Sequence, residues 1–430
     1  MIDQPTESMH RNLTESLGGH GPFSLYVHIP YCRTKCLYCD FNSYATPETP
    51  WREYLQALLV ELEAYRAHPF SGRHLTTLFF GGGTPSLFPP AFYEALLPRI
   101  FEQFPPEPGL ELTMECNPGT VSLEALQGYH SAGVNRLSFG VQSMNPVHLK
   151  TLTRLHGTQE AIDAVSLARE AGFDNVSIDL MFGVPGQSVE GWEEELSFAL
   201  TLPLEHLSVY NLTPEEGTAL VKQLERGRLF MPDEAYLVEM YRRTRQMLRE
   251  HGFRPYEISN FSRSRPCRHN LQYWTGGDYL GVGAGAHSFS AEGHRPPENG
   301  LELLPEAPTA QDAAPGGMRW STLKGLKDYY RACGENRLPI AGLEQLSRLE
   351  AAEEFLLTRG RLMVGIDLAA FEAKFGVRAR NAVEQRAQPF LRRELMAQGM
   401  DHIALTDEGV LVADSIVQAL SRAADGLISG

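Results

Sequence analysis

The sequence predicts an α/β fold built around a parallel β-sheet. From residue 23 to about 262, short apolar runs of strand length alternate with longer stretches that have the apolar period of amphipathic helices. Strands that alternate with helices in this way are joined by right-handed crossovers and lie parallel in one sheet. The alternation alone fits an open doubly wound sheet and a barrel-like sheet equally well.

Six apolar runs are expected to form the strands, and four amphipathic stretches between them are expected to be helices. The strands are FSLYVHI (23–29), TTLFFGG (76–82), LELTMEC (110–116), RLSFGVQ (136–142), NVSIDLMFG (175–183) and HLSVYNLTP (206–214). The helices are WREYLQALLVELEAY (51–65), VSLEALQGYHSAG (121–133), TQEAIDAVSLAREAG (158–172) and VEGWEEELSFAL (189–200).

The rest of the chain divides into three further segments. A polar tail covers 1–22, a connecting segment covers 263–321, and a mostly helical domain covers 322–430. The connecting segment contains a Pro/Ala/Glu-rich stretch, from Ala291 to Gly317, that is expected to be an exposed insertion. The end of the chain, ELMAQGMDHIALTDEGVLVADSIVQAL, has the order helix, short strand, turn and strand, which predicts a small winged-helix-like unit.

Composition argues against two classes of protein. The formal net charge is −15 and the pI is about 5.4, which argues against a nucleic-acid binder. No run of about 18 apolar residues is present, so no transmembrane segment is expected. The N-terminus has no apolar signal-peptide core, and we therefore expect a cytoplasmic protein.

Three of the six cysteines lie in one short loop, Cys32-x3-Cys36-x2-Cys39, directly after the first predicted strand. Closely spaced thiolates are the ligands of iron–sulfur clusters. Three ligands to a four-iron cluster leave one iron open, and an open coordination position binds a substrate or cofactor. The odd number of cysteines in the loop argues against disulfides.

A zinc site is the alternative for this loop. His28 precedes Cys32 by four positions and would complete a Cys3His set. His28 lies inside a predicted strand, however, and structural zinc sites usually use two separated ligand pairs. A zinc-stabilised interaction protein stays open on the loop alone.

Polar residues also stand where the predicted strands end, which is where parallel α/β folds collect their active-site groups. The glycines of GGGTP, from Gly81 to Pro85, would let the backbone approach a ligand closely. A carboxylate inside an apolar run, such as Asp179, is costly to bury unless it is paired or hydrogen-bonded. A plain turn and structural ion pairs are the alternatives for these residues.

The segment YVHIPYCRTKCLYCDF resembles the radical S-adenosylmethionine (SAM) proteins, and within them the group related to oxygen-independent coproporphyrinogen III oxidase. The resemblance runs from about Leu25 to about Leu420. It implies a partial (β/α)6 TIM-like barrel followed by the winged-helix-like domain. It also implies a 4Fe-4S cluster whose open iron binds SAM, and whose reduced form cleaves SAM to a 5′-deoxyadenosyl radical.

The resemblance assigns site residues position by position. Cys32, Cys36 and Cys39 would hold the cluster. The positions that match SAM-contacting residues are Tyr26, Tyr38, Gly82, Gly83, Thr84, Glu115, Gln142, Arg154 and Asp179, with a looser match at Thr213.

Two features resemble the heme chaperone branch of this group instead of the oxidase. The oxidase pattern continues with a further cysteine, CX3CX2CXC, whereas Cys39 is followed here by Asp40 and Phe41. The chain also has only about 24 residues before the first strand, where the oxidase has a longer arm.

The heme chaperone branch also carries HNxxYW, which is His269-Asn270-Leu271-Gln272-Tyr273-Trp274 here. An imidazole is a usual heme ligand and aromatic rings cover a porphyrin face, so His269, Asn270, Tyr273 and Trp274 are the heme candidates. Arg263, Arg265 and Arg268 could pair with heme propionates. A surface loop with a structural aromatic pair is the alternative.

The sequence therefore predicts a heme chaperone that carries a 4Fe-4S cluster and SAM and delivers heme to apo-hemoproteins. The alternative function is that of the oxidase, by radical decarboxylation of a porphyrinogen. Catalytic residues are not assigned. A heme donor, a homodimer and peripheral membrane contact are left open.

Overall fold

The computed structural model describes residues 23–303 and 316–422 and contains all six predicted strands. They are β1 (Phe23–Ile29), β4 (Leu75–Gly82), β5 (Pro106–Cys116), β6 (Arg136–Gln142), β7 (Val176–Phe182) and β8 (His206–Asn211). They lie parallel in chain order, so every crossover leads to the neighbouring strand. This is the order of a barrel. The barrel is partial because β1 and β8 each pair with a further strand instead of with one another.

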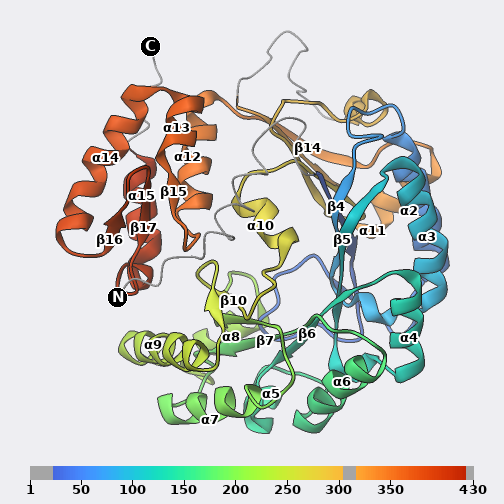
Figure 1. Ribbon diagram of the computed structural model, residues 1–430. Coiled ribbons are helices and arrows are strands. Elements are labelled where there is room, and N and C mark those ends of the chain that lie inside the picture. The colour runs from blue at the N-terminus through green and yellow to red at the C-terminus, as the bar shows by residue number, and fades with distance from the viewer. Residues whose placement is uncertain (1–22, 304–315, 423–430) are drawn as a thin grey trace.

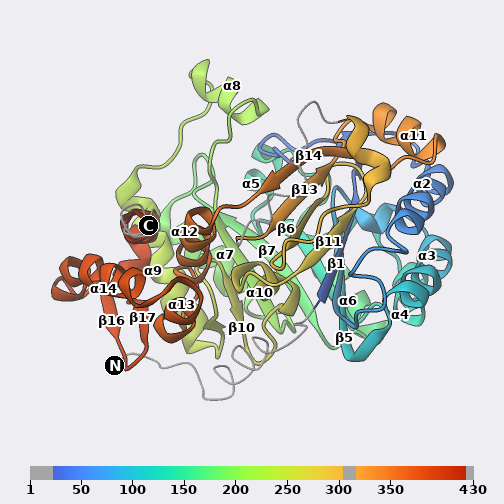
Figure 2. The same ribbon diagram turned by 90° about the horizontal axis from the view of Figure 1, so that it is seen from above.

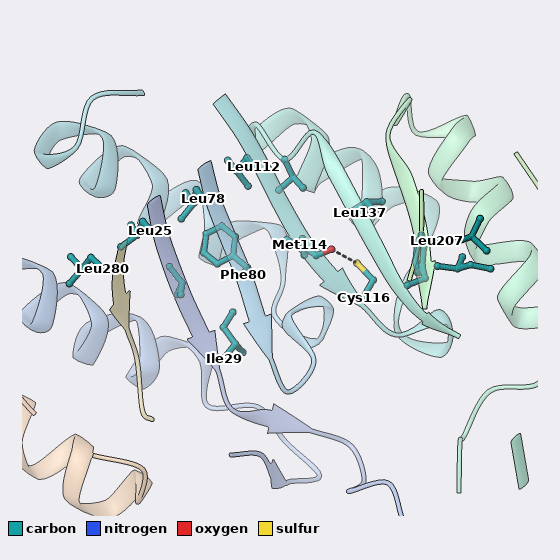
Figure 3. Close-up of a cluster of buried hydrophobic side chains, with 14 of the residues drawn as sticks. Leu25, Ile29, Leu78, Phe80, Leu112, Met114, Cys116, Leu137, Leu207 and Leu280 are labelled. Atoms are coloured by element: carbon teal, nitrogen blue, oxygen red, sulfur yellow. Dashed lines mark hydrogen bonds between the residues drawn. The ribbon is translucent and has the colours of Figure 1, made fainter. Parts of the chain in front are cut away.

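Helices cover the outside of this curved sheet (Figure 1). They include α2 (Trp51–Ala64), α3 (Pro90–Gln103), α4 (Leu123–Ala132), α6 (Thr158–Glu170) and α7 (Val189–Ala199), among which are all four predicted helices. Apolar side chains at alternate strand positions, such as Leu78, Phe80, Leu112 and Met114, form the core (Figure 3).

The intervening positions of the strands point inward and are largely polar. They include Tyr26 and His28 on β1, Glu115 on β5, Arg136 on β6 and Asp179 on β7. The sheet therefore has an apolar outer face that packs on helices and a polar inner face that is available for a site.

Further strands extend the sheet at both edges. Beyond β8 lie β10 (Asn260–Ser262) and β9 (Arg254–Pro255). Beyond β1 lie β11 (Tyr279–Val282), β12 (His287–Ser290), β13 (Met318–Thr322) and β14 (Ile340–Gln345). The segment predicted to be connecting, 263–321, thus contributes three strands to the main sheet. It also contributes α10 (Arg268–Trp274), which lies in the opening of the barrel (Figure 1).

The winged-helix-like unit follows β14. Its elements are α12 (Arg348–Arg359), β15 (Ile366–Asp367), α13 (Leu368–Phe375), α14 (Val377–Arg392), β16 (Met396–Gln398), β17 (His402–Leu405) and α15 (Ala413–Ser421). The strands form a small sheet in the order β15-β17-β16. Ion pairs hold this unit to α9 (Glu234–Glu250), including Arg245 Nη2 to Asp407 Oδ1 at 2.5 Å.

Two predicted segments fall wholly or partly outside the described residues. The polar tail, 1–22, lies outside them, as do 304–315 of the expected insertion. Among the helices that are described, none has the length and apolar character needed to cross a membrane.

Candidate cluster and cofactor site

Loops at the carboxyl ends of the parallel strands enclose a cavity of about 410 Å³. The three loop cysteines line it from the β1 side, and residues at or just after the carboxyl ends of β4, β5, β6, β7 and β8 line the remainder. Every predicted cluster and SAM residue except Tyr26 faces this cavity, and so does Thr213. We call it the outer cavity.

The three thiols of the loop are free and half-buried. Arg154 Nη1 donates to Cys36 Sγ at 3.1 Å, and Thr84 Oγ1 donates to Cys32 Sγ at 3.5 Å. Burial raises the pKa of the Cys32 and Cys39 thiols. A bound metal offsets such a rise, because coordination favours the thiolate.

The GGGTP loop requires its glycines because it packs against β1. A Cβ at Gly82, where φ is +110°, would lie 2.4 Å from the His28 ring, and a Cβ at Gly83 would lie 2.6 Å from the Tyr31 carbonyl oxygen. The Gly83 amide donates to the Ile29 carbonyl at 2.8 Å. Close backbone packing thus places Thr84 beside the cysteine loop.

Two buried carboxyl groups face the outer cavity from β5 and β7. Glu115 Oε2 accepts a hydrogen bond from the Gly82 amide at 3.0 Å, and Asp179 Oδ1 accepts one from Ser138 Oγ at 3.2 Å. Burial, with Asp179 nearby, raises the pKa of Glu115 to about 7, and burial also raises the pKa of Asp179. Neither carboxylate forms an ion pair within the described residues, so the alternative of structural ion pairs finds no support.

Gln142 and Arg154 line the outer cavity, and each has one buried polar atom without a hydrogen-bond partner within the described residues. Gln142 has a φ of 72° and lies at a break in the pairing of β6 with β7. Its Oε1 is buried without a partner, and so is Nε of Arg154, within the described part of the chain. Strained backbone and unsatisfied buried polar atoms are typical of ligand sites.

This donor set fits a cluster and SAM. The thiols lie on one side of the outer cavity, and the remaining lining offers carboxylates, a guanidinium and a free amide oxygen. SAM carries an ammonium, a carboxylate and ribose hydroxyls, which are partners for these groups. A volume of about 410 Å³ is in the range of small-molecule sites.

The zinc alternative finds no support. The two ring nitrogens of His28 are already hydrogen-bonded, Nδ1 with the Tyr26 hydroxyl at 3.0 Å and Nε2 with the Asn42 carbonyl at 2.9 Å. In 23–303 and 316–422, no three His, Cys, Asp or Glu side chains are grouped to hold a single metal ion.

Tyr26 lies apart from the other predicted SAM residues. Its side chain points to the inner face of the sheet and lines a second cavity of about 260 Å³, which we call the inner cavity. Its ring lies 6.3 Å from the imidazole of His269. The resemblance did not reveal this because one sequence position cannot specify which of two neighbouring cavities a side chain enters.

The HNLQYW segment forms α10, and its histidine is buried. His269 is 2 % exposed, its Nδ1 hydrogen-bonds with Thr77 Oγ1 at 2.7 Å, and its Nε2 hydrogen-bonds with the Tyr273 hydroxyl at 2.9 Å. Burial, and next the nearby Arg136, lowers the pKa of His269 to about 3, which keeps the ring neutral. The imidazole therefore has no free nitrogen for iron in this arrangement.

The other heme candidates are more accessible. Asn270 Nδ2 donates to the Tyr256 hydroxyl at 3.3 Å. Trp274 is half-buried, its Nε1 has no partner within the described residues, and the Arg361 guanidinium lies 5.5 Å from its ring centre.

The three arginines near this segment point to separate partners. Arg263 donates to the His251 carbonyl at 2.8 Å, Arg265 pairs with Asp174 at 3.0 Å, and Arg268 donates to the Gly109 carbonyl at 2.8 Å. They do not gather around α10 as a single propionate site.

A family model described as the Radical SAM superfamily matches residues 26–199, and one described as the HemN C-terminal domain matches 346–412. A relative from Mycobacterium tuberculosis, named heme chaperone HemW, is 34% identical over 93% of this chain and 95% of its own length. The Bacillus subtilis relative of the same name is 33% identical over 92% of this chain and 98% of its own. The chain belongs to the HemW family of radical SAM proteins.

A solved structure shares the fold of this HemW family member. The Escherichia coli coproporphyrinogen III oxidase, HemN, superposes with a TM-score of 0.76 over 98% of this chain and 94% of its own, at 22% identity. The family models and this shared fold together confirm the predicted fold class, a radical SAM core with a mostly helical C-terminal region.

Some lining residues of this HemW family member were not predicted. Ser138 and Tyr210 face both cavities, and Arg136 faces the inner one. The alternation of side chains along β6 and β8 could have identified these residues. It places Arg136 and Ser138 on the same face of β6 as Gln142, and Tyr210 on the corresponding face of β8. Arg136 was overlooked because it is the first residue of its strand, a position that is usually exposed.

Proposed function

We propose that this protein is a cytoplasmic heme chaperone that binds heme and transfers it to apo-hemoproteins. The observation that carries the proposal is the near full-length identity of 34% to a protein named heme chaperone HemW. The 22% identity to the oxidase supports a shared fold alone. Phe41, which is 62% exposed at the mouth of the outer cavity, stands where the oxidase pattern has its fourth cysteine.

We further propose that the outer cavity binds a 4Fe-4S cluster and SAM. Cys32, Cys36 and Cys39 would hold the cluster, and Arg154 would place positive charge beside the Cys36 sulfur. When bound and reduced, such a cluster can cleave SAM to a radical. Glu115 and Asp179 are positioned to accept hydrogen bonds from the polar groups of SAM, and Gln142 Oε1 offers a free acceptor.

The candidate heme site stays at α10, and it requires that the His269 ring changes its hydrogen-bond partners. Ligation of iron by His269 requires its ring to leave Thr77 and Tyr273, which costs two hydrogen bonds of about 1 kcal/mol each. Heme ligation of about micromolar strength, near −8 kcal/mol, exceeds that cost. Movement of α10 out of the barrel opening would expose the imidazole and both aromatic rings together.

The proposal is tested by two assays on the same anaerobically reconstituted protein. The first follows the Soret band during heme titration and then during transfer to apomyoglobin. The second measures conversion of coproporphyrinogen III with SAM and a reductant. We expect heme binding and transfer without conversion. Conversion without heme transfer would overturn the proposal in favour of the oxidase.

A further inference from the structure

The inner cavity is a second polar chamber inside the barrel. The inward positions of the parallel strands line it, and α10 closes it with His269, Asn270 and Tyr273. It shares Glu115 and Asp179 with the outer cavity, so the two chambers lie on either side of these carboxylates. The roles proposed above use these carboxylates and the residues of α10, and none of them uses Arg136.

Arg136 is the one guanidinium that lines the inner cavity within the described residues, and it is 2 % exposed. No hydrogen bond or ion pair to its guanidinium is present in that part of the chain, and its Nε is buried without a partner. A buried guanidinium without hydrogen bonds is costly, on the order of several kcal/mol. Such a group in a cavity points to a missing anion.

The chain's own carboxylates near Arg136 are already hydrogen-bonded elsewhere. Glu111 accepts from the backbone amides of Arg268 and His269 at 3.1 and 3.0 Å. Asp179 accepts from Ser138, and Glu115 accepts from Gly82. Glu111 and Asp179 attract the charge of Arg136 but form no ion pair with it within the described residues, so its guanidinium keeps donors for a ligand.

We propose that the inner cavity binds a carboxylate, with the Arg136 guanidinium donating two parallel hydrogen bonds to it. Arginine matches a carboxylate in this bidentate way, and burial strengthens the pair. The cavity of about 260 Å³ is smaller than most drug-sized sites and suits an acid of a few carbons. The carboxylate could belong to a free small acid or to the propionate arm of a porphyrin.

Equilibrium dialysis of the full-length, cluster-reconstituted protein with radiolabelled propionate tests this site. We expect saturable binding of one propionate per chain that unlabelled propionate displaces and propionamide, its neutral counterpart, does not. Arg136→Met should weaken binding by about tenfold or more. Arg99→Met, at an exposed position of α3, is the control and should retain it.

Arg136→Met breaks no hydrogen bond to the guanidinium within the described residues, and circular dichroism checks that the variant is folded. Should it fail to fold, Arg136→Lys keeps the charge but loses the bidentate fork, and it should still bind propionate more weakly than the parent. Absence of saturable binding, or binding that Arg136→Met keeps at the affinity of the parent, would overturn the inference.

Competition identifies the source of the carboxylate. Protoporphyrin IX should displace propionate where a porphyrin arm occupies the site, whereas its dimethyl ester should not. No displacement by either porphyrin assigns the site to a free acid. Because this readout does not involve heme transfer, failure of the site and failure of the chaperone proposal can be told apart.

Discussion

The guanidinium of Arg154 donates a hydrogen bond to the sulfur of Cys36, 118 positions earlier in the chain, at 3.1 Å. A second nitrogen of the same group donates to the Gly140 carbonyl at the end of β6. One side chain therefore fixes the cysteine loop to the neighbouring strand end. Its Nε still lacks a partner within the described residues, and it faces the cavity where we place SAM.

Replacement of Cys32, Cys36 or Cys39 by alanine should abolish stable cluster loading, since each would remove one of the three ligands. The reconstituted parent should contain about four irons and four sulfides per chain and absorb near 400 nm. Cys333→Ala is the matched control, because this buried thiol lies outside the cavity. Iron and sulfide analysis checks this, and one zinc without sulfide in the parent would contradict it.

Glu115→Gln and Asp179→Asn should weaken SAM binding by about tenfold each through loss of charged acceptors. The cluster should stay loaded because its ligands are unchanged. The measurement is the change in the EPR signal of the reduced cluster on SAM titration. Asp163→Asn, at an exposed position of α6, is the control. A parent-like titration in both variants would make these carboxylates structural.

Glu61 should make stability depend on pH. Its Oε2 accepts from the Tyr329 hydroxyl and the Gly283 amide, and burial raises its pKa to about 7. Below pH 4.5 the carboxyl is protonated in both the folded and unfolded states. Between pH 4.5 and about 7 the folded state keeps a proton that the unfolded chain has released, so roughly 3 kcal/mol of stability is lost over this range, and the loss levels off above pH 7.

Glu61→Gln should flatten this pH dependence, because an amide has no proton to lose in this range. Urea unfolding between pH 4.5 and 8 measures the effect, and Glu94→Gln, at an exposed position of α3, is the control. Equal slopes in the parent and Glu61→Gln would show that Glu61 does not titrate in this way.

Heme binding should release α10. Hydrogen exchange of the amides in Arg268–Trp274 should accelerate when heme is added, because His269 must leave Thr77 and Tyr273 to reach iron. His269→Ala should lower the Soret absorbance and heme transfer while the iron content of the cluster stays constant. An unchanged Soret band in both His269→Ala and Trp274→Ala would place heme elsewhere.

Conversion of coproporphyrinogen III should be absent even with SAM and a reductant present. Phe41, not cysteine, follows Asp40 at the mouth of the outer cavity. Chromatographic detection of the porphyrin product checks this. Product formation at ordinary enzyme rates, about one per second, would establish the oxidase alternative.

The sequence alone determined the parallel sheet and the outer cavity. Period-two apolar runs are local signals, and RLSFGVQ matches β6 from Arg136 to Gln142 residue for residue. Because parallel strands end at one edge of a sheet, residues at strand ends, such as Glu115, Gln142 and Asp179, could be placed together before the fold was known.

Only the tertiary structure decided which residues pack against the inward faces of the strands and which side chains are buried there. His269 was proposed as a heme ligand, but its ring is covered, because α10 enters the barrel opening and Thr77 and Tyr273 hydrogen-bond with the ring. Tyr26 turned into the inner cavity, and Arg136, at the start of a strand, became a buried charge. Burial and hydrogen-bond partners depend on elements far apart in the chain, which the local period of a single segment cannot encode.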